Sequence, residues 1–74
     1  MVKTALVTGA ARGIGLASTK RFLEEGYQVA MIDRDAEELL AAAATLDNTA
    51  AFICDVSDLE AVRQMFGDVI AWSG

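Results

Sequence analysis

The apolar and polar positions along the chain fall into two alternating kinds of segment. Three short apolar runs, residues 4–8, 28–32 and 50–54, show no regular polar alternation. This pattern is typical of strands that are covered on both faces, as in a parallel sheet. Longer stretches, whose apolar residues recur every three or four positions, lie between and after the runs and indicate amphipathic helices. The order strand, helix, strand, helix, strand, helix predicts a parallel α/β sheet.

The first two helices carry recognisable start and stop signals. The first is expected to begin at Gly13 and to end before Gly26, at a position where helices commonly place a left-handed residue. Its predicted packing face consists of Ile14, Ala17, Ser18 and Phe22. Asp35, with Glu38 three residues later, is an acidic variant of the capping box and predicts the start of the second helix. The predicted packing face of the second helix consists of Leu39, Ala43 and Leu46.

The third helix is predicted to run from a cap at Ser57 to about residue 72, with Gly74 as its C-cap. Ser57 and Glu60 fit the S-x-x-E capping box. The residues predicted to face inward are Leu59, Val62, Phe66, Val69 and Ile70. Right-handed crossovers place the first two helices on one face of the sheet and the third on the other. We therefore expect the βαβαβα portion of a doubly wound parallel sheet, with strand order 3-2-1 and truncated before a fourth strand.

Composition narrows the classes of function. The net charge is −5 and the six basic residues are scattered, whereas nucleic-acid binding needs clustered Lys and Arg. With no His and a single Cys, Cys54, neither metal-ligand spacing nor an internal disulfide is expected. No apolar run approaches the roughly 18 residues of a membrane span, and the N-terminus leads directly into a strand, so we expect no signal peptide. The interpretation is a cytoplasmic protein in which Cys54 is a small core residue.

The segment Thr8-Gly9-Ala10-Ala11-Arg12-Gly13-Ile14-Gly15 lies between the first strand and the first helix. A glycine-rich turn in this context brings phosphate oxygens against backbone N–H groups at a helix N-terminus, where the helix dipole also favours negative charge. Side chains at Gly9 or Gly13 would hold a pyrophosphate away, and one at Gly15 would separate the helix from the strand. The alternative is a purely structural turn, because tight strand-to-helix turns also need glycine.

Acidic residues follow the second and third strands. Asp33 stands 18 residues after Gly15, about where a dinucleotide-binding fold places the acid that accepts the ribose hydroxyls. Asp55 and Val56 follow the third strand at the same carboxyl edge, where ligands of open α/β sheets bind. Taken alone, Asp33 could be a helix-capping or solvated acid, and Asp55 a loop acid beside the Ser57 cap. Together with the glycine-rich turn, the three features indicate one nucleotide site.

The motifs T-G-x-x-x-G-I-G, Asp-Arg and Asp-Val, each following a strand, resemble those of the short-chain dehydrogenase/reductase family over the whole chain. The resemblance implies a larger Rossmann fold, usually dimeric or tetrameric, of which residues 1–74 are the N-terminal half of one NAD(P)-binding domain. It also implies roles for single residues. Gly9, Arg12 and Ile14 would line the pyrophosphate and adenosine ribose, and Gly13 and Gly15 of the same turn count among the cofactor-binding residues. Asp33 would bind the ribose hydroxyls, Arg34 would flank the adenine, and Asp55 and Val56 would contact it.

The expected function is hydride transfer between a nicotinamide cofactor and an alcohol or carbonyl substrate. Asp33 favours NAD over NADP, because a 2′-phosphate would lie against its carboxylate. The resemblance implies catalytic Ser, Tyr and Lys residues beyond Gly74, so no catalytic residue is assigned in this chain. Residues 1–74 alone are therefore not expected to turn over any substrate with NAD. Two alternatives stay open: a dinucleotide sensor without catalysis, and an NAD-dependent epimerase or dehydratase, although relatives of that kind usually show G-x-x-G-x-x-G. We further expect a homo-oligomer, formed through the missing part.

Overall fold

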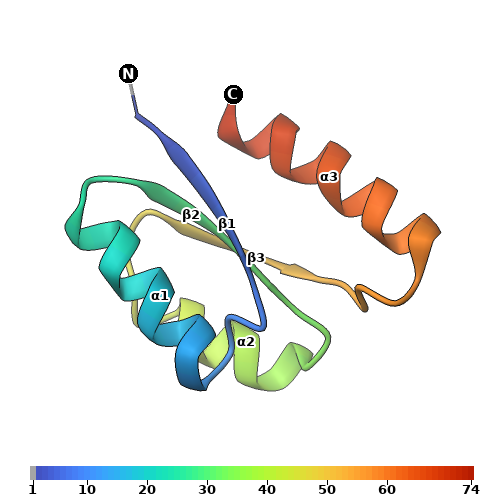
Figure 1. Ribbon diagram of the computed structural model, residues 1–74, viewed down its shortest axis with the longest axis horizontal. Coiled ribbons are helices and arrows are strands. Elements are labelled where there is room, and N and C mark those ends of the chain that lie inside the picture. Colours follow the sequence, from blue (N-terminus) through green and yellow to red (C-terminus); the bar gives the residue numbers. More distant parts are fainter. Residues whose placement is uncertain (1) are drawn as a thin grey trace.

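The computed structural model describes residues 2–74, in which three parallel strands alternate with three helices (Figure 1). The elements are β1 (Thr4–Thr8), α1 (Gly13–Glu24), β2 (Gln28–Asp33), α2 (Ala36–Ala43), β3 (Thr49–Ile53) and α3 (Leu59–Ser73). β2 is the central strand of the described sheet and pairs in parallel with β1 on one side and β3 on the other. The predicted α/β class and strand order are confirmed.

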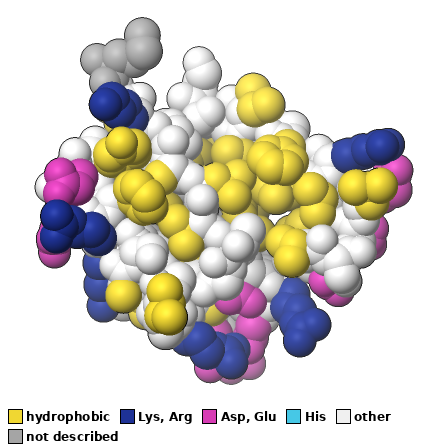
Figure 2. Space-filling view, in the orientation of Figure 1, with side chains coloured by type: hydrophobic (Ala, Val, Ile, Leu, Met, Phe, Trp, Pro, Cys, Tyr) yellow, Lys and Arg dark blue, Asp and Glu magenta, His cyan; other side chains and the backbone are white. Residues whose placement is uncertain are grey.

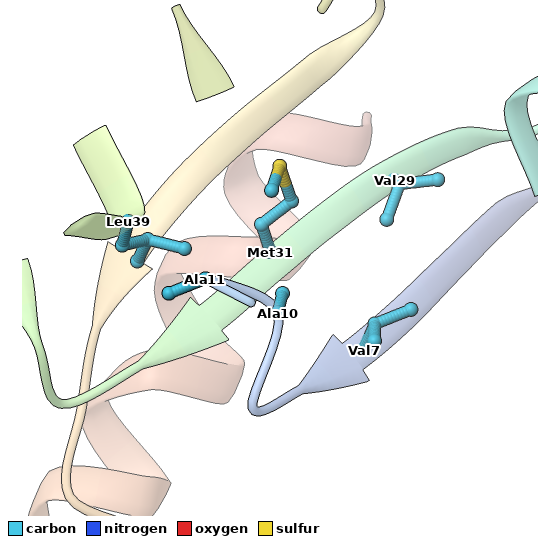
Figure 3. Packing of buried hydrophobic residues seen from close by; sticks show 6 residues of the cluster. All are labelled: Val7, Ala10, Ala11, Val29, Met31 and Leu39. Atoms are coloured by element: carbon cyan, nitrogen blue, oxygen red, sulfur yellow. The ribbon is translucent and has the colours of Figure 1, made fainter. Parts of the chain in front are cut away.

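The side chains of β2 supply the core on both faces of the sheet. Val29 and Met31 pack with Val7 and Leu39 on the face covered by α1 and α2, as Figure 3 shows for the cluster. Ala30 and Ile32 point to the opposite face, where they pack against α3; the rest of that cluster is Cys54, Met65 and Val69. All four apolar residues at positions 29–32 are fully buried, which explains the unbroken apolar run in the sequence. The predicted placement of the helices is confirmed, and Cys54 is buried.

The packing face of α1 differs from the prediction. Ile14 is 86% exposed and Ala17 is also exposed. The residues that turn toward the sheet are Leu16, Thr19, Phe22 and Leu23. The helix approaches the end of β1 at Gly15, where an added Cβ would lie only 1.9 Å from the carbonyl oxygen of Gly9. This contact sets the rotation of α1 and buries Thr19 one turn later, with its hydroxyl donating to the carbonyl of Gly15 at 3.0 Å.

The predicted boundary signals of α1 and α2 are present, with one difference. Gly26 has a φ of +88° just after α1, and Asp35 caps α2 by accepting a hydrogen bond from the N–H of Glu38 at 3.2 Å. The reciprocal half of the capping box is not made, because the N–H of Asp35 donates to Asp33 and the Glu38 carboxylate pairs with Arg12. The packing face of α2 is as predicted, with Leu39 buried and Ala43 and Leu46 packed against the same cluster.

The predicted cap of α3 is wrong by one residue. Asp58 is the N-cap, and its Oδ1 accepts from the N–H groups of Glu60 and Ala61 at 3.1 and 3.2 Å. The hydroxyl of Ser57 instead donates to Oδ1 of Asp55 at 2.7 Å. The hydrogen bond to Asp55 therefore holds Ser57 in the turn before the helix. Asp58, the next residue but one after Val56, caps the first turn of the helix instead. Gly74 forms the C-cap with a φ of +82°.

The packing face of α3 is rotated relative to the prediction. Val69 is buried and Val62 packs against the core, but the contact is completed by Ala61, Met65 and Trp72. Three predicted core residues are exposed: Leu59 by 65%, Phe66 by 49% and Ile70 by 68%. Figure 2 shows hydrophobic side chains gathered between β1 and α3 on the viewed face. No helix within residues 2–74 is long and apolar enough to cross a membrane.

Candidate functional site

The carboxyl ends of all three strands meet at a hollow of about 350 Å³. Its lining residues are Thr8, Gly9, Ile32, Asp33, Arg34, Cys54, Asp55, Val56 and Ser57. Parallel strands end at one edge of a sheet, which is where open α/β folds bind ligands. Five of the predicted site residues, Gly9, Asp33, Arg34, Asp55 and Val56, thus come together, while Arg12, Gly13, Ile14 and Gly15 lie in the adjoining loop and the first turn of α1.

Two glycines of the glycine-rich loop have a left-handed backbone conformation. Gly9 and Gly13 adopt φ angles of +64° and +58°, in the left-handed region that disfavours L side chains. A Cβ at either position would meet nothing within 4 Å, so space beside both glycines is open to a ligand. The loop is held against the sheet by the N–H of Ala10, which donates to the carbonyl of Ile32 at 3.0 Å. Gly15 is required for close packing instead, as predicted.

The first turn of α1 offers backbone donors beside this loop. The N–H of Leu16 donates to the carbonyl of Arg12 at 3.2 Å, so the N–H groups of Gly13, Ile14 and Gly15 precede that bond. Such groups lack a partner within their own helix, and together with the helix dipole they attract anions. The strong exposure of Ile14 leaves this end of the helix accessible. The geometry therefore suits a phosphate group.

Asp33 is fixed in orientation by main-chain donors. Its Oδ2 accepts from the N–H of Ala11 and its Oδ1 from the N–H of Asp35, each at 3.1 Å. The N–H of Asp35 chiefly holds the pKa of Asp33 below its usual value, with further contributions from Ala11, Arg34 and Arg12 that outweigh partial desolvation. Each carboxylate oxygen has a second lone pair, so Asp33 can still accept hydrogen bonds from hydroxyl groups. Because Asp35 caps α2, Asp33 has no capping role.

Asp55 presents a second carboxylate to the hollow. Its Oδ1 accepts from the N–H and the hydroxyl of Ser57 at 3.0 and 2.7 Å, and these bonds lower the pKa of Asp55. Its Oδ2 receives no hydrogen bond from any residue of the described chain. Val56 is 59% exposed at the same rim. One oxygen of Asp55 thus stabilises the turn that contains Ser57, and the other can accept a hydrogen bond from a donor such as an amino group.

Two contacts at the site are not evident from the sequence. The guanidinium of Arg12 donates to Oδ2 of Asp35 at 2.6 Å and also pairs with Glu38. The N–H of Ala11, a residue without distinctive side-chain chemistry, orients Asp33. No sequence pattern predicts either contact. The one related feature is that Glu38 stands three residues after the N-cap, at the acidic position of a capping box. Within residues 2–74, no three or more Cys, Asp or Glu side chains are grouped so that they could hold a metal ion.

Comparison with known proteins decides the family. A family model described as short chain dehydrogenase matches residues 3–74. The chain belongs to this family. It is 39% identical over 69 residues to carbonyl reductase family member 4 of Xenopus tropicalis, and the aligned region covers 93% of this chain and 29% of that protein. It is 40% identical over 74 residues to 15-hydroxyprostaglandin dehydrogenase [NAD(+)] of Rattus norvegicus, covering 92% and 28%.

Solved structures show the same arrangement. A 3-ketoacyl-(acyl-carrier-protein) reductase from Brucella melitensis, complexed with NADH, superposes with a TM-score of 0.88 at 31% identity, covering 93% of this chain and 29% of that one. An NADP-dependent dehydrogenase of Cochliobolus lunatus is also similar in sequence, at 35% identity over 72 residues, with 96% of this chain and 25% of that protein covered. The chain therefore spans less than a third of the length of these relatives, and they include both NAD and NADP types.

Proposed function

We propose that residues 1–74 are the adenosine-binding part of a longer NAD-dependent oxidoreductase that transfers a hydride between nicotinamide and an alcohol or carbonyl substrate. The observation that carries the proposal is the ionised Asp33 carboxylate, held by two main-chain N–H groups at the edge of the hollow and able to accept further hydrogen bonds. Membership of the short chain dehydrogenase family supports the reaction class. The proposal takes the whole protein to be a cytoplasmic homo-oligomer.

The residues of the site fit a dinucleotide in three places. Gly9 and Gly13 leave open space beside the first N–H groups of α1, which have no partner within their own helix and would hold the pyrophosphate. Asp33 would accept the adenosine ribose hydroxyls, and Asp55 with Val56 would contact the adenine. When bound, the nicotinamide would accept or donate the hydride. In this proposal residues 1–74 bind and orient the cofactor, and the acid or base that serves the substrate lies elsewhere in the longer protein.

Asp33 supports a preference for NAD over NADP. A 2′-phosphate beside this carboxylate would bring like charges together, and at about 4 Å and an effective dielectric constant near 20 they repel by roughly 4 kcal/mol per charge pair. Even when reduced about threefold for water and movement, this repulsion corresponds to a preference of about tenfold. The relatives named for NAD and for NADP leave the cofactor to be settled by experiment.

The test is a titration of the full-length protein with NAD, NADP and ADP-ribose by isothermal titration calorimetry. We expect NAD to bind about tenfold more tightly than NADP. ADP-ribose should compete with NAD, because the groups supplied by residues 1–74 contact the adenosine and phosphates. A panel of alcohols should then give NADH, detected by its absorbance. Failure of NAD and ADP-ribose to bind would refute the nucleotide site, and binding without any hydride transfer would favour a dinucleotide sensor.

A further inference from the structure

Arg12 is joined to the start of α2 by two carboxylates. Its Nη2 lies 2.6 Å from Oδ2 of Asp35, and its Nε pairs with Glu38. The neighbouring N–H of Ala11 binds Asp33, whose other oxygen accepts from the N–H of Asp35. The loop before α1 and the turn before α2 are thus connected twice, once through the Asp33 carboxylate and once through this ion-pair cluster of Arg12, Asp35 and Glu38.

The two acids of the cluster do different work. Asp35 caps α2 through Oδ1, which accepts from the N–H of Glu38. The carboxylate of Glu38 makes no return bond to the N–H of Asp35, because that N–H is given to Asp33. Within residues 2–74, the contact made by the Glu38 carboxylate is its ion pair with Arg12. Glu38 can therefore be changed without removing the helix cap.

We infer that Glu38, acting through Arg12, is a positioning residue that disfavours a 2′-phosphate and so adds to the preference for NAD. The inference rests on the proposed nucleotide site. Arg12 is the cation nearest in sequence to the donor that orients Asp33, and its charge lowers the pKa of Asp33. A phosphate on the ribose that Asp33 would bind would therefore be attracted by the positive charge of the Arg12 guanidinium. Pairing with two carboxylates neutralises that guanidinium and directs it toward α2.

Releasing Arg12 should benefit NADP and leave NAD little changed. The side chains of Arg12 and Glu38 are 62% and 50% exposed, so the pair is screened by water and its loss should cost the fold little. A guanidinium freed from one carboxylate can donate to phosphate oxygens, for which its planar fork is well suited. A purely structural role of Glu38 would instead alter the binding of both cofactors together.

The experiment measures the dissociation constants of NAD and NADP for the full-length protein and four variants. Glu38→Gln removes the charge that pairs with Arg12. Glu37→Gln is the matched control, since Glu37 lies in the same first turn of α2 and the structure gives it no ion pair within residues 2–74. The third variant combines Glu38→Gln with Arg12→Gln, and the fourth, with which it is compared, is Arg12→Gln alone. We expect Glu38→Gln to raise the affinity for NADP relative to NAD by about two- to fivefold, the range of one exposed ion pair.

The expected pattern also includes an unchanged ratio in Glu37→Gln and no effect of Glu38→Gln once Arg12 is replaced. An equal change in both affinities, an equal effect of Glu37→Gln, or an effect that persists without Arg12 would overturn the inference while leaving the proposed function intact. If the unmodified protein binds neither dinucleotide, the proposed function fails and this inference fails with it.

Discussion

The backbone N–H of Ala11 donates a hydrogen bond to Oδ2 of Asp33 at 3.1 Å, across 22 positions of the sequence. The bond joins the loop after β1 to the last residue of β2. Because the N–H of Asp35 holds the other oxygen, rotation of the carboxylate would break one bond or the other. The loop that would receive phosphate and the acid that would receive the ribose are therefore positioned by one another.

Replacing Asp33 should move cofactor preference toward NADP. Asp33→Ser removes the charge that would oppose a 2′-phosphate, and we expect the ratio of kcat/KM for NAD to that for NADP to fall by about tenfold. Asp47→Ser is the control, since Asp47 is exposed in the turn between α2 and β3. Steady-state kinetics of the full-length protein measure the ratio, and an unchanged ratio in Asp33→Ser would contradict the assigned role.

The lowered pKa of Asp33 fixes the direction of its pH dependence. A carboxyl whose folded-state pKa is below its usual value of 3.8 stabilises the fold above that value, and the stabilisation is lost as the pH falls through the lower folded-state pKa. The difference in thermal midpoint between the unmodified protein and Asp33→Ser should thus stay constant from about pH 7 to about pH 5 and shrink below about pH 4. A difference that already closes between neutrality and pH 5 would mean that the pKa is raised instead.

Two glycines in helices should respond oppositely to alanine. Gly15→Ala would place a Cβ 1.9 Å from the carbonyl oxygen of Gly9, so backbone must shift, and we expect a loss of stability of about 1–3 kcal/mol or more. Gly67→Ala in α3 meets nothing within 4 Å and should gain about 0.5–1 kcal/mol, because alanine loses less backbone entropy in a helix. Thermal unfolding of the full-length variants gives the signs, and a stable Gly15→Ala protein would refute the close approach.

The capping of α3 can be tested by comparing adjacent residues. Asp58→Ala removes the acceptor for the N–H groups of Glu60 and Ala61 and should cost roughly 1 kcal/mol. Ser57→Ala keeps that cap and loses an exposed bond to Asp55, so its effect should stay within about 0.5 kcal/mol. Equal losses for the two variants, measured as shifts in denaturation midpoint, would mean that Ser57 shares the capping role.

Residues 1–74 in isolation should associate rather than fold as a stable monomer. Within the described sheet β1 pairs only with β2, which leaves an unpaired strand edge. Leu59, Phe66 and Ile70 of α3 are also exposed. Burial of such a side chain is worth about 1.5–3 kcal/mol, a large part of a total stability of about 5–15 kcal/mol. Sedimentation and denaturant unfolding measure this, and a monomer with a cooperative transition and dispersed amide signals would contradict the prediction.

Local sequence was sufficient for the order of elements and for the edge at which the site lies. Three apolar runs separated by helical periods predict a parallel sheet, and parallel strands must end at one edge. Gly9, Asp33 and Asp55 therefore line the same hollow, as expected from positions that directly follow strands. The close packing at Gly15 was also predicted from the sequence, because it depends on a short turn and its neighbours.

Tertiary structure decided how the helices are rotated and which side chains meet. The sequence period of α1 allows several packing faces, and the contact between Gly15 and Gly9 selects the one that buries Thr19 and exposes Ile14. The pairing of Arg12 with Glu38 joins residues from separate turns, and no local rule specifies it. The sequence by itself determined hydrophobic period, turn chemistry and the strand ends. Rotations and long-range ion pairs were settled only when the elements packed together, because they depend on distances between segments that the sequence does not encode locally.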